Sequence, residues 1–452
     1  MGKDDSVDEI LFKNIDDYLV LRQATPHDAE ALAEFNARIH SDEGPDQPFE
    51  GVAVWTRDLL ERPHPTFKPS DFTVVEDVSE GKIVSSLNLI SQTWSYRGIE
   101  FGVGRSELVG TDPEYRSRGL IRLQYETIHK WSAARGEMVQ AITGIPNFYR
   151  QFEYEMAINL GGGRAGYITD VPRLKKDEDE PFRIRPAEED DLSFIASLYQ
   201  QSSQRSLVYC TWDESLWMYE LKGKSEKNIN RYELGIIETP AGDIVGYLAH
   251  PQQNWYQGTM LPATAFEVTP GVSWSSVTPS VIRYLVETGQ VYAKRDKNDG
   301  FGSFGFWLGG EHPVYDVISH KLPRIRKPYA WYIRVPDLVG FLRHINPILE
   351  ERLARSPFVG YSGEVKITQY RDGFKFIFDE GHLDVEAWQP SPRGHSGGAA
   401  FPDLTFIQLL FGYRSVDELD FAFADCWFKN DEIKGLLNIL FPKISSNVWP
   451  IS

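Results

Sequence analysis

The chain has 452 residues and a formal net charge of −18, with 41% hydrophobic and 25% charged residues. This length is too great for one hydrophobic core and predicts about two to four domains. The acidic balance argues against nucleic acid and anionic membranes as partners but suits a cationic substrate such as an amine. The sequence has no run of about 18 apolar residues, so we expect no transmembrane helix.

The cysteine content is low, and the beginning of the chain lacks the features of a signal peptide. Cys210 and Cys426 are far apart and have neither disulfide nor zinc spacing, so we expect buried packing residues and no metal. Residues 1–17 form an acidic leader without a basic segment and a long apolar one. A reducing cytoplasm fits these features best.

The first part of the chain predicts a strand, helical segments and then strands. Thr25 is suited to cap a helix, with Pro26 at the first helical position and an apolar period that continues to Ile39. An α+β domain is therefore expected. The predicted elements are strands at 18–22, 72–76, 82–90 and 99–109 and helical segments at 29–39 and 54–60.

A basic loop with one glycine follows the last of these strands. Asp112-Pro113 marks a turn, Arg116 and Arg118 precede Gly119, and an apolar helix opens at Leu120. The first turn of a helix has unpaired N–H groups, its dipole favours an anion, and glycine lets the backbone come close. The loop therefore predicts a site for a phosphate group.

Beyond a charged linker at 175–181, the order of the opening elements recurs. Arg185 and Asp191 are six apart, as are Arg22 and Asp28 (191 − 185 = 28 − 22). This recurrence, at a period of about 160 residues, indicates a copied domain. The segment 271–277 of the second copy lacks the basic glycine loop.

A third unit begins near Val335. It combines an amphipathic helix over 338–349, strands at 363–368, 374–378 and 383–388, a Gly/Ser-rich loop at 391–399 and a helix at 432–440. The chain ends in an apolar tail, Trp449-Pro450-Ile451-Ser452.

Two motifs carry a family resemblance: Arg116-x-x-Gly119-Leu120, and Phe148-Tyr149 with the aromatic residues after it. The first resembles the acyl-CoA-binding motif of GNAT acetyltransferases, and the whole arrangement resembles the enhanced-intracellular-survival (Eis) type. Ile121 stands where the commonest GNAT loop has a small residue, and Glu153 where the family often has glycine.

The resemblance covers nearly the whole chain and implies three folded units. These are an active GNAT domain (18–174), a degenerate GNAT domain (181–334) and a sterol-carrier-protein-like α/β domain with a C-terminal tail (335–452). It also implies a homo-oligomer, with a hexamer as one suggested form.

The resemblance implies acetyl-CoA as co-substrate. N–H groups between Ser117 and Arg122 would bind the pyrophosphate, the strand end at Val109 would bind the pantetheine amides, and Gly144 and Ile145 would line the other side. The expected cofactor-binding residues are Val109, Gly110, Thr111, Arg116, Ser117, Arg118, Gly119, Leu120, Ile121, Arg122, Gly144 and Ile145.

Two residues are candidates for proton transfer. A phenol has a pKa of about 10, so Tyr149 can give a proton to a leaving thiolate; the alternative is that it only packs behind the loop. The resemblance favours the acid. It also brings the C-terminal carboxylate, here that of Ser452, into the active site as a base, the alternative being a frayed tail.

The acceptor is poorly determined by the sequence. By the resemblance, Asp42, Glu43 and Glu107 face the acceptor side and could hold an ammonium group, although such residues are more often solvated surface acids. We expect an N-acetyltransferase acting on amines of an aminoglycoside- or polyamine-like molecule or of protein lysine. The alternative is a non-catalytic ligand- or lipid-binding protein that uses the third domain.

Overall fold

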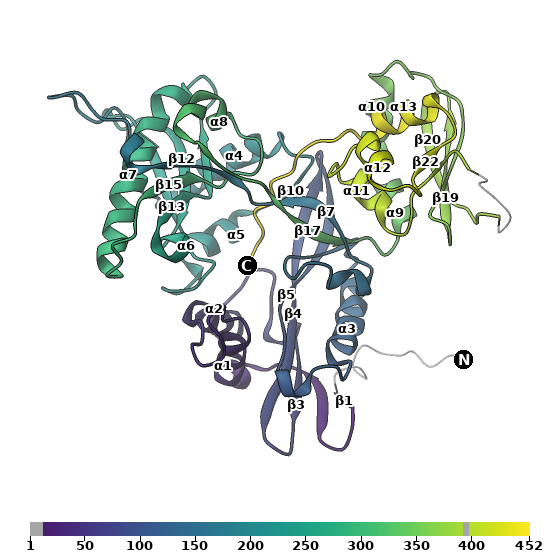
Figure 1. The fold of residues 1–452 in the computed structure, drawn as a ribbon, viewed down its shortest axis with the longest axis horizontal. Helices are drawn as coiled ribbons and strands as arrows, with labels where there is room; N and C mark the ends of the chain where they lie inside the picture. Colours follow the sequence, from purple (N-terminus) through teal and green to yellow (C-terminus); the bar gives the residue numbers. More distant parts are fainter. Residues whose placement is uncertain (1–11, 392–396) are drawn as a thin grey trace.

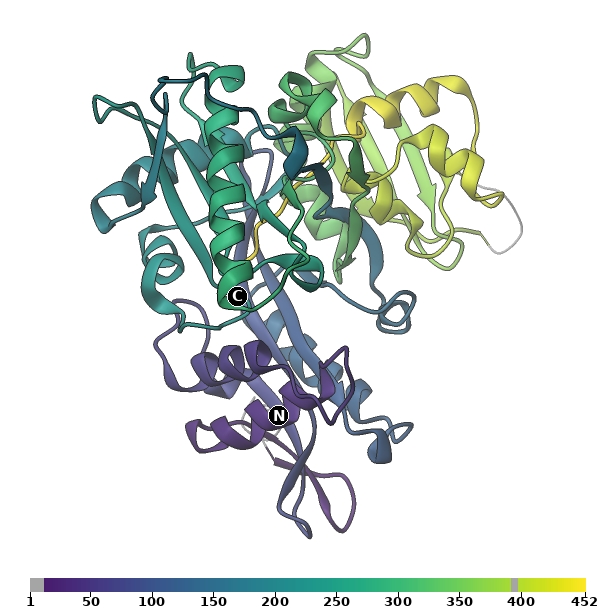
Figure 2. The ribbon, with the colours of Figure 1, turned by 60° about the vertical axis from the view of Figure 1, so that its left-hand side comes forward.

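The computed structural model describes residues 12–391 and 397–452. Most of the predicted leader (1–11) and part of the Gly/Ser-rich loop (392–396) lie outside the described residues. The fold is mixed α/β with several sheets, and Figure 1 shows three lobes around two long central strands. The described part of the C-terminal tail ends at the junction of the lobes (Figure 2).

The first lobe contains a sheet in the order β1-β2-β3-β4-β5-β6-β17-β7, and β10 also pairs with β4. Its two longest strands correspond to the predicted strands at 82–90 and 99–109, and each is longer in the structure than predicted. The strands are β1 (Phe12–Asn14), β2 (Leu19–Gln23), β3 (Phe72–Asp77), β4 (Lys82–Tyr96), β5 (Ile99–Thr111), β6 (Val139–Ile142), β7 (Glu155–Leu160), β10 (Val208–Cys210) and β17 (Tyr329–Arg334).

Helices cover both faces of this sheet. Helices α1 (Ala29–Ile39) and α2 (Glu50–Glu61) lie on one face and α3 (Leu120–Ala134) on the other (Figure 1). Alternate residues along a strand point to opposite faces. Accordingly, Ile90 packs in the α1–α2 core, whereas Leu89 packs with α3.

The second lobe holds two four-stranded sheets, ordered β14-β12-β11-β9 and β13-β15-β8-β16. Its strands are β8 (Gly163–Tyr167), β9 (Arg183–Pro186), β11 (Tyr232–Glu238), β12 (Ile244–Pro251), β13 (Met260–Ala263), β14 (Ala265–Val268), β15 (Ser303–Phe306) and β16 (Arg324–Arg326). Its helices are α4 (Leu192–Ser203), α5 (Glu214–Met218), α6 (Trp255–Gly258), α7 (Trp274–Arg295) and α8 (Pro313–Val317).

The first two lobes exchange strands. β8 follows the first-lobe strand β7 in sequence but pairs with β15 and β16 of the second lobe. In return, β17 leaves the second lobe and pairs between β6 and β7. The two lobes therefore share backbone hydrogen bonds, which local sequence patterns did not predict.

The same charged cluster opens both lobes. Arg22 on β2 pairs with Asp28 at 2.6 Å and Glu76 at 2.7 Å. Arg185 on β9 pairs with Asp191 at 2.6 Å and with Glu238 at 3.1 Å. The equal spacing in the sequence thus corresponds to equal local geometry.

The third lobe is a five-stranded sheet covered by helices. The predicted helix over 338–349 is broken at Ile345. A new helix begins at Asn346, with Pro347, which has no N–H, in its first turn. The elements are β18 (Gly363–Thr368), β19 (Gly373–Asp379), β20 (His382–Ala387), β21 (Ala399–Ala400), β22 (Trp427–Phe428), α9 (Leu338–His344), α10 (Asn346–Ala354), α11 (Thr405–Leu410), α12 (Val416–Ala422) and α13 (Asp431–Leu440).

Both cysteines are buried and free, as expected. Among the described residues, no group of three or more His, Cys, Asp or Glu side chains could hold a metal ion. Within that same part of the chain, none of the helices has the length and apolar character needed to cross a membrane.

Candidate active site

The site is built on an irregularity in β5. Ser86 pairs with Gly110 and Asn88 with Glu107, so Leu87 of β4 faces two residues of β5, Leu108 and Val109. This is a β-bulge, and Leu108 takes the left-handed conformation with φ of 52°. A bulge bends its strand and re-aims the backbone groups beside it.

Strands β5 and β6 then separate. They pair in parallel only from Val103 to Arg105 on β5 and from Val139 to Ala141 on β6. The bulged end of β5 therefore has no β-strand partner on that side among the described residues. An extended chain with amide groups, such as pantetheine, can bind such a free strand edge.

The glycine loop follows the bulged strand end. Gly119 caps α3 with φ of 76°, and Ser117 is also left-handed with φ of 62°. The loop turns sharply, and the first N–H groups of α3, which begins at Leu120, lack helical partners. These donors lie where the sequence predicts a site for a phosphate group.

The arginines around the loop are largely held by other side chains. Arg118 donates to Asp16 at 3.0 Å and to the hydroxyl of Tyr18 at 2.6 Å. Arg116 donates to the carbonyl of Thr111 at 3.3 Å, and Arg122 to Gln151 at 3.3 Å. All three guanidinium groups belong to exposed residues, so they supply a positive field at the cavity entrance.

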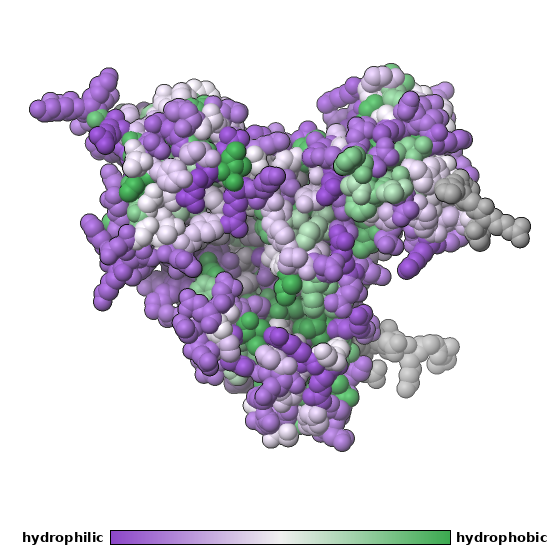
Figure 3. Space-filling model, in the orientation of Figure 1, coloured by the Kyte–Doolittle hydropathy of each residue, from purple (hydrophilic) through white to green (hydrophobic). Residues whose placement is uncertain are grey.

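A cavity of about 670 Å³ joins the loop to the bulged strand. Of the twelve expected cofactor-binding residues, it is lined by all except Gly144, which instead packs on Tyr149. A Cβ at Gly144 would lie 3.3 Å from the Tyr149 ring, and its φ is 139°. Figure 3 shows apolar side chains gathered in the hollow near β4, β5 and α3.

Tyr149 lies on the wall of this cavity in the short 3₁₀ helix Tyr149–Phe152. The residue is 4% exposed, and its hydroxyl has no hydrogen-bond partner among the described residues. Burial raises the pKa of Tyr149, and the nearby Glu107 and Tyr332 raise it further. The phenol therefore keeps its proton at neutral pH and can donate it.

The turn after Tyr149 explains a departure from the family pattern. Glu153, which stands where glycine is frequent, takes the left-handed conformation with φ of 68°. Its carboxylate accepts two bonds from Arg334 of β17, the shorter at 2.7 Å. The glycine-like turn geometry is thus kept, at the conformational cost of a non-glycine residue.

The three expected ammonium-binding carboxylates do not form one group. Glu107 is paired with Arg105 at 2.5 Å, and both side chains are largely buried. Asp42 and Glu43 lie in an exposed loop, and neither lines the cavity beside Tyr149. The structure therefore places Glu107 near the site and leaves the other two in solvent.

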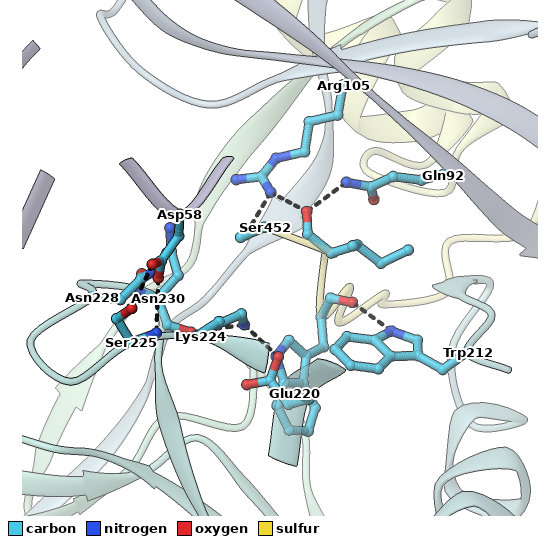
Figure 4. A network of polar contacts seen from close by, with 12 residues as sticks. Asp58, Gln92, Arg105, Trp212, Glu220, Lys224, Ser225, Asn228, Asn230 and Ser452 are labelled. Atoms are coloured by element: carbon cyan, nitrogen blue, oxygen red, sulfur yellow. Dashed lines mark hydrogen bonds and ion pairs between the residues drawn. The ribbon is translucent and has the colours of Figure 1, made fainter. Parts of the chain in front are cut away.

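The C-terminal tail is docked against the central strands. Ser452 is 5% exposed and Ile451 is 2% exposed. The indole of Trp212 donates to the carbonyl of Trp449 at 3.1 Å, and the Trp449 ring packs on Trp212 and Trp217. Figure 4 shows Ser452 beside Arg105 and Gln92.

Four further polar residues were not predicted: His40 at the cavity, and His64, Gln92 and Arg105 around the C-terminal tail. His40 lines the cavity, and its Nε2 is buried without a partner among the described residues. Arg105 could have been found, because the strand period puts it on the same face as Glu107. The other three are brought close only by the fold.

The comparisons agree with this geometry. Residues 20–157 match a family model described as acetyltransferase (GNAT) domain. This part of the chain is therefore a GNAT acetyltransferase domain, and such domains transfer an acyl group from acetyl-CoA. No curated protein matches the chain.

Several solved structures share the fold along nearly the whole chain. A probable N-acyltransferase of Enterococcus faecalis V583, described as a conserved protein of unknown function, has a TM-score of 0.64 and 14% identity, covering 96% of this chain and 99% of its own. A GCN5-related N-acetyltransferase of Kribbella flavida has a TM-score of 0.61 and 17% identity, covering 97% and 98%. Eis1 of Mycobacterium abscessus has a TM-score of 0.54 and 12% identity, covering 96% and 99%.

Proposed function

We propose that the protein is an acetyl-CoA-dependent N-acetyltransferase of the Eis type. Its acceptor would be an amine of an aminoglycoside- or polyamine-like molecule or of protein lysine. The observation that carries this proposal is the single cavity that joins the glycine loop, the bulged end of β5 and the free hydroxyl of Tyr149.

In the proposed reaction, acetyl-CoA supplies an activated acetyl group. A backbone N–H near Val109 polarises its carbonyl, and the uncharged amine attacks the carbonyl carbon. The carboxylate of Ser452 takes the proton from the amine, directly or through water. The C–S bond then breaks, and Tyr149 gives its proton to the leaving thiolate.

The domain plan belongs to the same proposal. The matching Arg22 and Arg185 clusters support two related domains, the active one predicted at 18–174 and the degenerate one at 181–334. Strands β8 and β17 lie within these ranges but pair in the opposite lobe. The sheet and helices of the third lobe agree with a sterol-carrier-like domain at 335–452. A cytoplasmic location and a homo-oligomeric state, with a hexamer as one form, stay predictions.

The alternative lipid-binding function has less support from the third lobe. Phenylalanine rings meet in its interior: Phe374 and Phe406 have ring centroids 4.9 Å apart, and those of Phe376 and Phe441 are 6.0 Å apart. These rings are buried against one another in the largest core of the described residues. Rings packed in this way leave little room for a lipid chain between them. A cavity of about 840 Å³ lies at the edge of this core, lined in part by Leu338, Phe374 and Ile407.

A thiol-release assay with acetyl-CoA tests the proposal. The acceptors would be aminoglycosides, polyamines and lysine peptides, with product mass measured by mass spectrometry. We expect thiol release that depends on one of these amines, with one acetyl group added to it. Acetyl-CoA binding without release for any acceptor would instead support a non-catalytic binding protein.

A further inference from the structure

The last two residues of the chain are held by two side chains from the central strands (Figure 4). The carbonyl of Ile451 accepts from Nε2 of Gln92 at 2.8 Å and from Nη1 of Arg105 at 2.6 Å. The same Nη1 donates to the hydroxyl of Ser452 at 2.7 Å. Gln92 is 4% exposed and Arg105 is 6% exposed, so water cannot easily replace these bonds.

The side chains of Arg105 and Gln92 are also held by residues outside the tail. Glu107 binds Nη2 of Arg105, and the guanidinium lies 5.4 Å from the centre of the Trp331 ring. The indole of Trp94 donates to Oε1 of Gln92 at 2.9 Å, which turns the amide nitrogen toward Ile451. A donor pre-oriented in this way loses little entropy when it binds.

A histidine, His64, also lies close to the terminus. The N–H of Thr66 donates to Nδ1 of His64 at 3.1 Å, so in neutral His64 the proton is on Nε2. Burial lowers the pKa of His64 to about 4, Lys224 lowers it too, and the backbone of Ser452 acts in the opposite direction. His64 is therefore neutral near pH 7, and its N–H can face the terminal group.

We propose that Arg105 and Gln92 are positioning residues that hold the carboxylate of Ser452 beside the acetyl-binding end of β5. This inference rests on the proposed role of Ser452 as base. Arg105 is the last β5 residue paired with β6, directly before the free strand edge. One strand thus places both the tail and the acetyl donor, which fixes the distance between base and substrate.

The first measurement is digestion of the intact full-length protein with a carboxypeptidase, followed by mass spectrometry. The variants are Arg105→Lys, which keeps the charge but loses the forked geometry, and Gln92→Met, which keeps the volume and leaves the Arg105–Glu107 pair intact. Arg97→Met is the control, because Arg97 is an exposed residue between β4 and β5 that binds the carbonyl of Gln204.

We expect release of Ser452 to be about tenfold faster in both variants, since each loses a buried hydrogen bond to the tail. The control should match the wild type. Release at the wild-type rate in both variants would overturn the clamp. Because Gln92→Met removes no charge, it tests the clamp even if Arg105→Lys fails to fold.

The second measurement is steady-state kinetics with an accepted amine. Both variants should lower kcat about tenfold and leave the KM for acetyl-CoA unchanged, because they misplace the base without touching the cofactor cavity. A released tail with unchanged kcat would overturn the positioning role. Deletion of Ile451 and Ser452 separates the two proposals: full activity there removes Ser452 as base, whereas the digestion result still reports on the clamp.

Discussion

The cavity beside the glycine loop in the first lobe and a cavity in the second lobe lie on similar scaffolds but differ in size and lining. In each, one strand pairs in parallel with its neighbour and then separates: β5 from β6, and β13–β14 from β15. The first cleft encloses about 670 Å³, whereas about 300 Å³ remains in the second, partly walled by the C-terminal tail. The separation of two strands therefore does not by itself fix the size of the cleft between them.

The tyrosines that follow β6 and β15 show the difference most directly. Tyr149 presents a hydroxyl without a partner among the described residues. Tyr315 donates its hydroxyl toward the carbonyls of Phe306 and Gly309, at 3.0 and 3.1 Å, and accepts from the N–H of Leu308 at 3.3 Å. The second hydroxyl serves the fold, and the first is free for a ligand.

The helix starts differ as well. In the second lobe Trp274 opens α7 and packs on Phe266 of β14 and on His312, with ring centroids 5.0 and 5.2 Å away. The first lobe has the basic loop and Gly119 at this place. In the second lobe an indole therefore lies beside the strand, where the first lobe has an open glycine loop.

Matched tyrosine variants should give the largest effect. Tyr149→Phe should lower kcat about 100-fold, because the acid is lost, with acetyl-CoA affinity nearly unchanged. Tyr315→Phe should leave kcat unchanged and lower the free energy of unfolding by about 1–3 kcal/mol, because its backbone partners lose a buried hydroxyl. Kinetics and urea unfolding measure the two effects.

The acid role has a pH signature. Because burial raises the pKa of Tyr149, the wild-type enzyme should not lose activity through phenol ionisation as pH approaches 10. Equal turnover in Tyr149→Phe and the wild type would remove Tyr149 as the acid and make the two tyrosines equivalent.

Matched glycine variants should give a smaller effect. Gly119 and Gly271 both have a positive φ, 76° and 91°, and open space around them. Alanine at either site should cost about 1–2 kcal/mol of stability through backbone strain. Only Gly119→Ala should also raise the acetyl-CoA dissociation constant, by about tenfold, because the methyl group faces the anion site. Isothermal titration calorimetry checks this, and equal affinities would contradict the assigned loop.

Matched arginine variants probe what the two lobes still share. Arg22→Lys should lower the free energy of unfolding by about 1–2 kcal/mol and Arg185→Lys by about 1 kcal/mol or less, because lysine loses the forked contact. The difference follows from exposure, since the Arg22 side chain is 17% exposed and that of Arg185 is 35% exposed. Neither should change acetyl-CoA affinity, and a lost affinity in Arg22→Lys would link this cluster to the site.

The smallest effect is a pH dependence of the same clusters. For Asp28 burial acts to raise the pKa, but the Arg22 and Thr25 hydrogen bonds outweigh it, so its pKa is lowered; the hydrogen bond from Arg185 chiefly lowers that of Asp191. A lowered carboxyl pKa stabilises the fold above the unfolded value of 3.8, and this stabilisation is lost as pH falls through the folded value. Between pH 5 and pH 2 the free energy of unfolding should therefore fall less steeply in Arg22→Lys than in the wild type. An unchanged slope would exclude a contribution from the Arg22–Asp28 pair.

The sequence by itself determined the local parts of the protein. Periodicity predicted helix 29–39 and strand 363–368 with the bounds that the structure has. The glycine loop and Tyr149 were also predictable from the sequence, because loop conformation and helix capping depend on neighbours in the chain. The turn at Glu153 was left in doubt by the sequence, because a non-glycine residue stands there, and the structure shows that the left-handed conformation is kept.

Only the tertiary structure decided which distant residues meet. The bulge at Leu108, the exchange of β8 and β17, and the contact of Arg105 and Gln92 with Ile451 join segments up to 359 positions apart. Such contacts depend on packing and on burial of polar groups, which no local pattern encodes. The glycine loop and Tyr149 were therefore predictable from neighbours in the chain, whereas the side chains that hold the C-terminal tail are decided by the fold.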